Sequence, residues 1–171
     1  VMGMLADMKD NVSDWTDVEQ VDNYLRKILN KEAFDRTGLI YGIGHAVYTI
    51  SDPRTALLKN MAKDLAKEKG REDEFAFMEL IEERAIKVFM EAKKRTAKGN
   101  VCVNVDFYSG FVYDAIGLPS EVYTPLFAMA RIVGWTAHRI EEMNFTSKRL
   151  IRPAYKNVRE LQEFTPLKDR K

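Results

Sequence analysis

The apolar positions of this chain recur with a helical period wherever a period is present. The clearest case is residues 14–31, in which the expected core positions are Val18, Val21, Leu25, Ile28 and Leu29. Residues 72–98 repeat the pattern over a longer, polar-faced stretch. No stretch alternates apolar and polar residues for long enough to predict a pair of strands. The sequence therefore predicts an all-α fold.

Two local signals predict a further helix over residues 53–69. Asp52 is expected to cap the free amides at its start, and Pro53 suits the first helical position, where no amide hydrogen bond is needed. Gly70 is placed to end the helix. The expected core face consists of Leu57, Leu58, Met61 and Leu65.

Residues 37–51, TGLIYGIGHAVYTIS, are apolar and contain three glycines but no helical period. They predict a buried loop or a short hairpin. His45 in this segment follows two closely spaced glycines, which let a backbone approach a ligand. Its imidazole is either a hydrogen-bonded core group or a donor to a ligand carbonyl.

The most apolar helix is expected over residues 121–143, because its first half is apolar on nearly every side. That pattern predicts a central helix, which would bury the guanidinium of Arg131 in its charged form. A buried charge needs a partner. The partner is either an acidic residue in a structural ion pair or an anionic ligand, since a planar guanidinium suits a carboxylate.

Asp106 stands just before a predicted helix over residues 107–116. One interpretation is a helix cap, in which its carboxylate accepts hydrogen bonds from free amides. The other is a general base whose carboxylate is held in an apolar setting by Phe107 and Tyr108.

Composition argues against several functions. The 27 lysines and arginines are balanced by 26 aspartates and glutamates, and a net charge of +1 does not favour binding to nucleic acid. One cysteine and two histidines predict neither a metal site nor an internal disulfide. The longest nearly apolar stretch, residues 125–137, is too short to span a membrane. We expect a cytoplasmic protein, and the start at Val1 indicates a piece of a longer one.

Four segments, in order along the chain, resemble one known family. They are YGIGHAVYTISDPR, NVDFYSGFVYDAIGLP, TPLFAMARIVGWTAHRIEE and IRPAY. Together they resemble the carboxyl-terminal part of a bacterial citrate synthase, which implies a chain without the amino-terminal half. The resemblance implies the end of a large-domain helix at 1–11 and a mobile, helical small domain at 12–117. Residues 118–171 would form the last part of the large domain and the contacts of a homodimer.

The resemblance also implies a role for individual residues. His45 would donate a hydrogen bond to the carbonyl of oxaloacetate, and Asp106 would remove a methyl proton from acetyl-CoA. Arg54 and Arg131 would bind the carboxylates of oxaloacetate, and Arg152 would reach the site of the other subunit. The remaining contacts would be an aromatic ring at the site, Phe127, and a loop at the CoA adenine, formed by Gly42, Ile43, Gly44, Ala46 and Val47.

The function that the resemblance implies is the condensation of acetyl-CoA with oxaloacetate to citrate and CoA, with no permanently bound cofactor. The segment HAVYTISDPR also resembles 2-methylcitrate synthases, which use propionyl-CoA. Many members carry a basic residue shortly after the histidine, whereas this chain has none there, so the groups that bind the CoA phosphates are left open. A helical interaction module without catalysis is the alternative from another class. As an enzyme, the 171-residue chain is expected to be inactive without the amino-terminal half.

Overall fold

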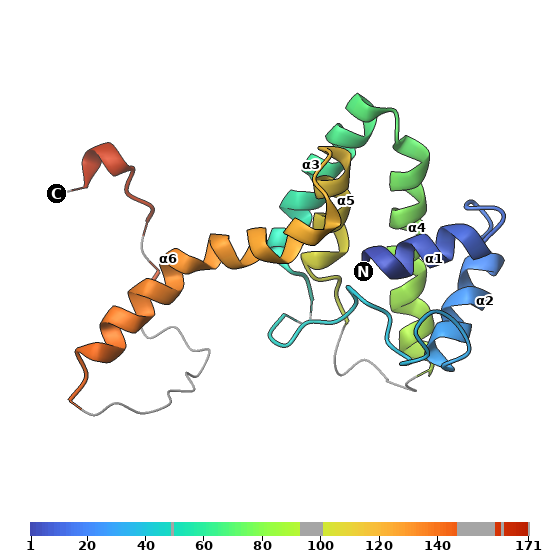
Figure 1. Cartoon of the computed structure of the whole chain (residues 1–171), viewed down its shortest axis with the longest axis horizontal. Helices are drawn as coiled ribbons and strands as arrows, with labels where there is room; N and C mark the ends of the chain where they lie inside the picture. The colour runs from blue at the N-terminus through green and yellow to red at the C-terminus, as the bar shows by residue number, and fades with distance from the viewer. Residues whose placement is uncertain (49, 93–100, 147–159, 162, 171) are drawn as a thin grey trace. The chain divides into compact units, whose positions relative to one another are not determined.

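Figure 1 shows a computed structural model of the chain, which describes residues 1–48, 50–92, 101–146, 160–161 and 163–170. The elements in these ranges are α1 (Met2–Asn11), α2 (Val18–Leu29), α3 (Pro53–Lys69), α4 (Glu72–Ala92), α5 (Asp106–Ala115), the 3-10 helix η1 (Ser120–Val122), α6 (Tyr123–Met143) and the 3-10 helix η2 (Leu167–Asp169). No strand forms in these ranges, where one isolated antiparallel bridge joins Ile43 to Val103. The all-α prediction is confirmed.

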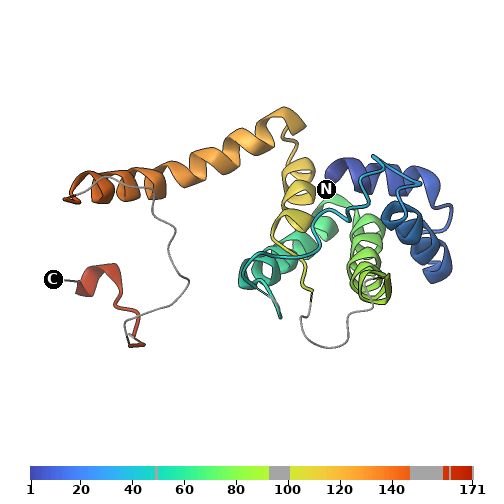
Figure 2. The same ribbon diagram turned by 90° about the horizontal axis from the view of Figure 1, so that it is seen from below.

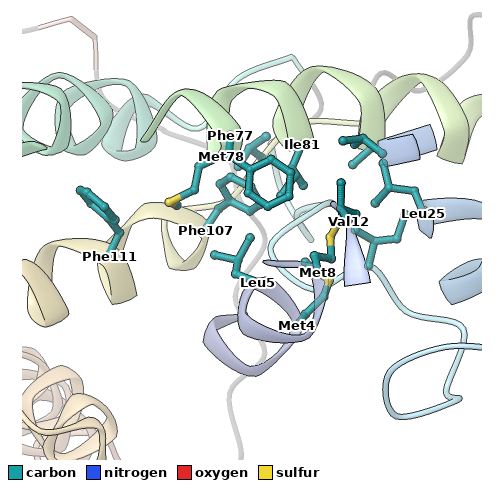
Figure 3. Packing of buried hydrophobic residues seen from close by; sticks show 14 of the residues in the cluster. Met4, Leu5, Met8, Val12, Leu25, Phe77, Met78, Ile81, Phe107 and Phe111 are labelled. Carbon is teal, nitrogen blue, oxygen red and sulfur yellow. The ribbon is translucent and has the colours of Figure 1, made fainter. Parts of the chain in front are cut away.

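The chain forms two compact units, Val1–Met129 and Ala130–Lys171. The hydrophobic core belongs to the first unit and joins α1, α2, α4 and α5 with the inner face of α3. Figure 3 shows how α1 contributes to it. The buried side chains drawn there from α1, α4 and α5 include Met4, Leu5, Met8, Phe77, Met78, Ile81, Phe107 and Phe111.

Helix α2 follows its sequence signals closely. The carboxylate of Asp17 accepts from the amides of Glu19 and Gln20 over 2.8 and 3.2 Å, which caps the helix. Of the predicted core face, Val21, Leu25 and Ile28 are buried and Leu29 is partly buried, whereas Val18 in the first turn is exposed, contrary to expectation. A salt bridge then joins α2 to α4, because Arg84 donates from Nε and Nη2 to the two oxygens of Asp22 over 2.7 and 2.6 Å.

Helix α3 begins and ends where the sequence predicts, but only part of the predicted face meets the core: Leu58 packs against it and Leu65 is half-buried. Asp52 caps its start, and Gly70 ends it in the left-handed conformation with φ of 65°. The residues buried in α3 are Thr55, Ala62 and Ala66. The prediction for Leu57 and Met61 was wrong, since they are 70% and 63% exposed. Small residues at the contact let α3 pack closely against α4 and α5, which lie beside it in Figure 2.

The prediction of a central helix over residues 121–143 is wrong for this chain. The helix itself forms as α6, but none of its residues is buried. Large apolar side chains stay exposed along it, with Val133 at 80% and Trp135 at 58%. The described part of this chain supplies no layer that covers α6, so its apolar composition does not lead to burial. Arg131 is consequently exposed, and the expectation of a buried guanidinium is also wrong.

Candidate active site

A short two-stranded contact holds the glycine loop against the start of α5. The amide of Gly44 donates to the carbonyl of Cys102 over 2.7 Å, and the amide of Asn104 donates to the carbonyl of Gly42 over 2.9 Å. The bridge between Ile43 and Val103 lies between these bonds. A hairpin within residues 37–51 was therefore the wrong expectation, because the loop pairs with a segment distant in sequence.

Only the middle of this loop is buried. Ile40 and Gly42 lie in the core, whereas the side chains of Ala46, Val47 and Tyr48 are exposed. The expectation of a loop buried along its whole length is thus wrong both at Leu39, which is 56% exposed, and after His45. The loop is buried where it pairs with residues 102–104. This pairing involves Gly42 and Gly44 but not the residues after them.

Gly42 allows the loop to approach α5 closely. Its φ is +87°, a left-handed conformation that favours glycine. A Cβ atom at this position would stand 2.8 Å from Cδ2 of Phe107 and 3.3 Å from its Cα. Because Phe107 follows Asp106 directly, Gly42 keeps the loop close to the beginning of α5.

The two ring nitrogens of His45 have different surroundings: Nδ1 is hydrogen-bonded to the backbone, and Nε2 faces polar side chains. Nδ1 accepts from the amides of Val47 and Tyr48, both over 3.0 Å, and the ring packs on Tyr48 with centroids 4.7 Å apart. Two amide donors assign Nδ1 as the unprotonated nitrogen, so the neutral ring carries its proton on Nε2. Nε2 lies 3.2 Å from Nη2 of Arg54 and 3.8 Å from Oδ2 of Asp52.

Asp52 is the buried anchor of Arg54. Its side chain is fully buried and accepts from the amide and Nε of Arg54, each over 3.0 Å, and from Nη2 over 2.8 Å. Hydrogen bonding to Arg54 is the main cause that lowers the pKa of Asp52. The side chain of Arg54 stays 46% exposed, so its guanidinium is fixed in orientation and remains accessible to an anion.

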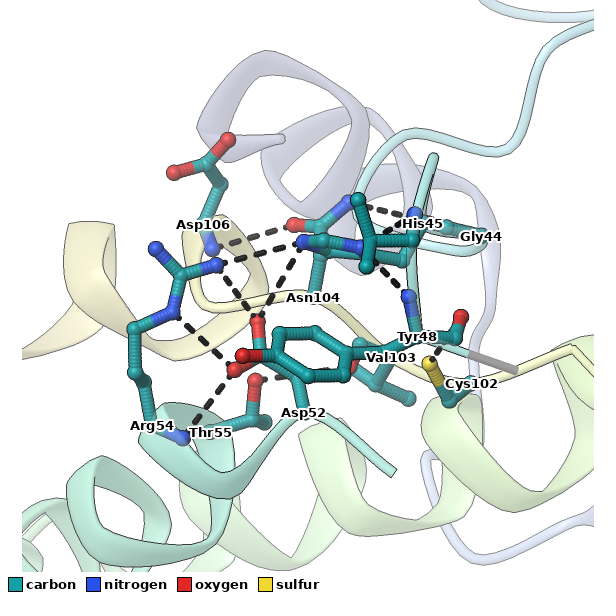
Figure 4. Close-up of polar contacts among 11 residues, drawn as sticks. Gly44, His45, Tyr48, Asp52, Arg54, Thr55, Cys102, Val103, Asn104 and Asp106 are labelled. Atoms are coloured by element: carbon teal, nitrogen blue, oxygen red, sulfur yellow. Dashed lines mark hydrogen bonds and ion pairs between the residues drawn. The ribbon is translucent and has the colours of Figure 1, made fainter. Parts of the chain in front are cut away.

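Asp106 is not the cap of α5. It is the first residue of the helix, and its own amide donates to Oδ1 of Asn104 over 3.0 Å. The expected apolar setting for its carboxylate is wrong as well, because Phe107 and Tyr108 are fully buried in the core while Asp106 is exposed. In Figure 4 the guanidinium of Arg54 lies between the Asp106 carboxylate and Asp52. The Asp106 charge contributes to raising the pKa of Arg54, whose largest cause is the hydrogen bond to Asp52.

A pocket of about 700 Å³ opens beside Asp106. Its lining residues include Tyr41, Gly42, Asn104, Asp106, Tyr123 and Phe127. Phe127 and Asp106 were both assigned to one site by the sequence resemblance, and both line this pocket. The pocket lies within the first compact unit.

The structure brings together some of the sequence-predicted site residues. His45 and Arg54 are in contact, and Asp106 interacts electrostatically with Arg54. Arg131 belongs to the second compact unit and Arg152 lies outside the described residues, so their place in the site stays a prediction. The loop residues assigned to the CoA adenine are Gly42, Ile43 and Gly44, which pair with 102–104, and Ala46 and Val47, which are exposed.

Sequence reasoning missed two polar residues that organise this site. It treated Asp52 only as a cap, although the same carboxylate also orients Arg54. Asn104 had no predicted role, yet its side chain bonds to both the loop and the start of α5. The available signal was spacing, since Asp52 and Asn104 each stand two residues before a predicted site residue.

Within the described residues, no cluster of histidine, cysteine, aspartate and glutamate has the arrangement of a metal site. None of the helices in those ranges has the length and hydropathy needed to cross a bilayer. The one cysteine, Cys102, is buried, and burial raises the pKa of its thiol.

Residues 1–154 match the family model for the C-terminal domain of citrate synthase. The chain belongs to the citrate synthase family. The citrate synthase of Acidithiobacillus ferridurans is 39% identical over 137 residues, which cover 80% of this chain and 32% of that protein. The citrate synthase of Deinococcus radiodurans is 38% identical over 156 residues, covering 90% of this chain and 37% of that protein. The chain thus spans about a third of the length of these citrate synthases.

Solved structures of citrate synthases share the fold. One is the ternary complex of carboxymethyl coenzyme A and oxaloacetate with citrate synthase from the archaeon Thermoplasma acidophilum. It matches with a TM-score of 0.63 and 29% identity, covering 97% of this chain and 40% of that one. The citrate synthase of Thermotoga maritima matches with a TM-score of 0.59 and 30% identity, covering 99% of this chain and 43% of that one.

Proposed function

We propose that this chain is the carboxyl-terminal part of an enzyme that condenses acetyl-CoA with oxaloacetate to give citrate and CoA. One observation carries the proposal. Three groups from different segments gather in one cluster: the imidazole of His45, the guanidinium of Arg54 and the carboxylate of Asp106. Membership of the citrate synthase family supports oxaloacetate and acetyl-CoA as the substrates of that cluster.

Arg54 is proposed to bind oxaloacetate. The substrate carries two carboxylates, and a guanidinium held at a fixed angle binds a carboxylate with two parallel hydrogen bonds. Asp52 supplies that fixed angle. Arg131 is proposed as a further cation of the site, and Arg152 as one contributed across a homodimer. Several guanidiniums are required because a dianion in a closed site needs several compensating charges.

His45 is proposed to bind the reacting carbonyl. Its Nδ1 is occupied by two backbone amides, which leaves the Nε2 proton available to a carbonyl oxygen. Bound oxaloacetate would also separate the Nε2 proton of His45 from the guanidinium of Arg54, since both are donors and their present 3.2 Å contact is not a mutual hydrogen bond.

Asp106 is proposed as the general base. Its carboxylate would take a proton from the methyl group of acetyl-CoA, and the resulting enolate carbon would attack the carbonyl carbon of oxaloacetate. The carbonyl oxygen would receive the Nε2 proton of His45 as the new carbon–carbon bond forms. The product of this step is a thioester, and its hydrolysis by water would give citrate and CoA.

Two further parts of the proposal are the binding of CoA and the division of the chain into domains. The loop from Gly42 to Val47 is proposed to lie at the CoA adenine, and Phe127 to pack beside the substrates in the pocket next to Asp106. Residues 12–117 are proposed as a mobile small domain, with 1–11 and 118–171 as parts of a large domain. Closure of the small domain would exclude water from the enolate.

The decisive experiment replaces the proposed base in the full-length protein. We expect Asp106→Asn to lower kcat by at least about 100-fold, because the amide cannot accept the methyl proton. The dissociation constant of oxaloacetate should change by less than about threefold. Asp64→Asn on the exposed face of α3 is the matched control and should leave both values unchanged. Condensation by Asp106→Asn at the rate of the unsubstituted protein would refute the assignment.

Propionyl-CoA is the second candidate substrate, favoured by the resemblance of HAVYTISDPR to 2-methylcitrate synthases. Steady-state kinetics of the full-length protein with each acyl-CoA separate the two. We expect the higher kcat/KM with acetyl-CoA. If neither acyl-CoA is turned over and oxaloacetate does not bind, the chain belongs to a protein that keeps the fold as an interaction module.

A further inference from the structure

We propose that Asn104 is the positioning residue that sets the geometry between His45 and Asp106. The inference rests on the proposed function, because it assigns these two residues as the proton donor and the general base. They come from segments about sixty positions apart in the sequence. The side chain of Asn104 bonds to the backbone of Gly44, just before His45, and to the backbone amide of Asp106.

The amide group of Asn104 joins the two segments directly. Its Nδ2 donates to the carbonyl of Gly44 over 3.0 Å, and Gly44 directly precedes His45. Its Oδ1 accepts from the amide of Asp106 over 3.0 Å. One planar group therefore connects the backbone before the proposed donor to the backbone of the proposed base, as Figure 4 shows.

The chemistry of the two partners determines which residue type can do this. The Gly44 carbonyl only accepts and the Asp106 amide only donates, so the orientation of the Asn104 amide is fixed by its partners. Aspartate has the same shape but no donor for Gly44. Serine can accept from the Asp106 amide as capping residues do, but its single hydroxyl is too short to bridge both groups.

We expect the fold to persist without this side chain. The backbone bonds between Gly44 and Cys102 and between Asn104 and Gly42 use no side-chain atoms, so they persist in a variant. Phe107, Tyr108 and Phe111 anchor α5 in the core independently. Loss of the Asn104 side chain would therefore release only the local fit between the loop and the first residue of α5. Small displacements of reacting groups lower rates by up to about 100-fold.

The test uses Asn104→Ser in the full-length protein. Serine keeps an acceptor for the Asp106 amide and removes the bond to Gly44, so it separates the bridging role from simple capping. We expect kcat with acetyl-CoA to fall by about 10- to 100-fold. The KM for oxaloacetate should change by less than about threefold, and the thermal midpoint by only a few degrees. Asn60→Ser, at an exposed site on α3, is the matched control.

A second variant protects the test against a folding defect. Asn104→Asp keeps the shape and the acceptor for Asp106 but places an oxygen against the Gly44 carbonyl, and we expect at least as large a loss of kcat. A kcat for Asn104→Ser within about twofold of the unsubstituted protein would overturn the inference, and so would unfolding of both variants. Absence of turnover in the unsubstituted protein would instead refute the proposed function, and this inference with it.

Discussion

The neighbouring helices α5 and α6 are both rich in apolar residues, yet only one of them is packed. α5 buries Phe107, Tyr108 and Phe111 completely against α3, α4 and α1. α6 buries none of its residues. The same hydropathy signal therefore has two outcomes, because hydropathy shows that a face favours a partner but not whether the chain contains that partner.

The proposed site includes residues from both the packed helix and the exposed helix. Asp106 stands at the start of the packed helix, where Asn104 and Gly42 hold the adjoining loop. Arg131 stands on the exposed helix, outside the first compact unit. The packed region therefore holds the groups proposed for proton transfer, whereas the proposed carboxylate contact of Arg131 depends on structure beyond that region.

The largest difference in stability is expected between alanine substitutions of one phenylalanine in α5 and one in α6. Phe107→Ala should lower the free energy of unfolding by about 3–5 kcal/mol, because it leaves a cavity in the core. Phe127→Ala should lower it by less than about 1 kcal/mol, since that side chain is 42% exposed. Urea unfolding of the 171-residue chain, followed by circular dichroism, measures both. Equal losses would mean that α6 is packed in solution, and the comparison would fail.

Replacing one glycine in the packed region and one in α6 tests the same difference, with a smaller expected change in the free energy of unfolding. Gly42→Ala should cost about 2–3 kcal/mol, because alanine is strained at φ of +87° and its Cβ would stand 2.8 Å from the Phe107 ring. Gly134 lies within α6, and a Cβ there would meet nothing within 4 Å. Gly134→Ala should therefore stabilise the chain by about 0.5–1 kcal/mol through helix propensity. The opposite sign at either position would contradict the structure.

The helices were predictable because their signals are local. Asp52 caps the helix that its position predicted, and Gly70 ends α3 as expected. The inner face of α3 was not predictable in the same way. Leu57 and Met61 are larger and more apolar than Ala62 and Ala66, yet the small residues are the buried ones. Small residues are buried there because α3 packs closely on α5, and a single sequence contains no direct signal for such a contact.

The site was predictable in its residue types but not in its connections. The sequence singled out His45, Arg54 and Asp106, and the structure brings them into one cluster. A helix cap was one of the two interpretations of Asp106, whereas Asn104 accepts the Asp106 amide. Both side chains suit a helix start, so only the three-dimensional path of the chain distinguishes them. Pairing between residues 42–44 and 102–104 is likewise a long-range contact without a local signal.

The smallest expected effect is on stability at low pH, and it again differs between the packed region and α6. The folded pKa of Asp52 lies below its unfolded value because of Arg54, so its stabilising contribution is present above the unfolded pKa. That contribution disappears as the pH falls through the folded pKa. Asp52→Asn should therefore cost about 1–2 kcal/mol near pH 6, and the difference should shrink toward zero near pH 2.

Urea unfolding of both chains across this pH range measures the difference, and other acids cancel because both chains carry them. The exposed pair of His138 and Glu141 on α6 provides the contrast. Glu141→Gln should change the free energy of unfolding by less than about 0.5 kcal/mol at any pH, since exposed ion pairs contribute little. A cost of Asp52→Asn that stays constant down to pH 2 would mean that the Asp52 carboxylate does not stabilise the loop through Arg54.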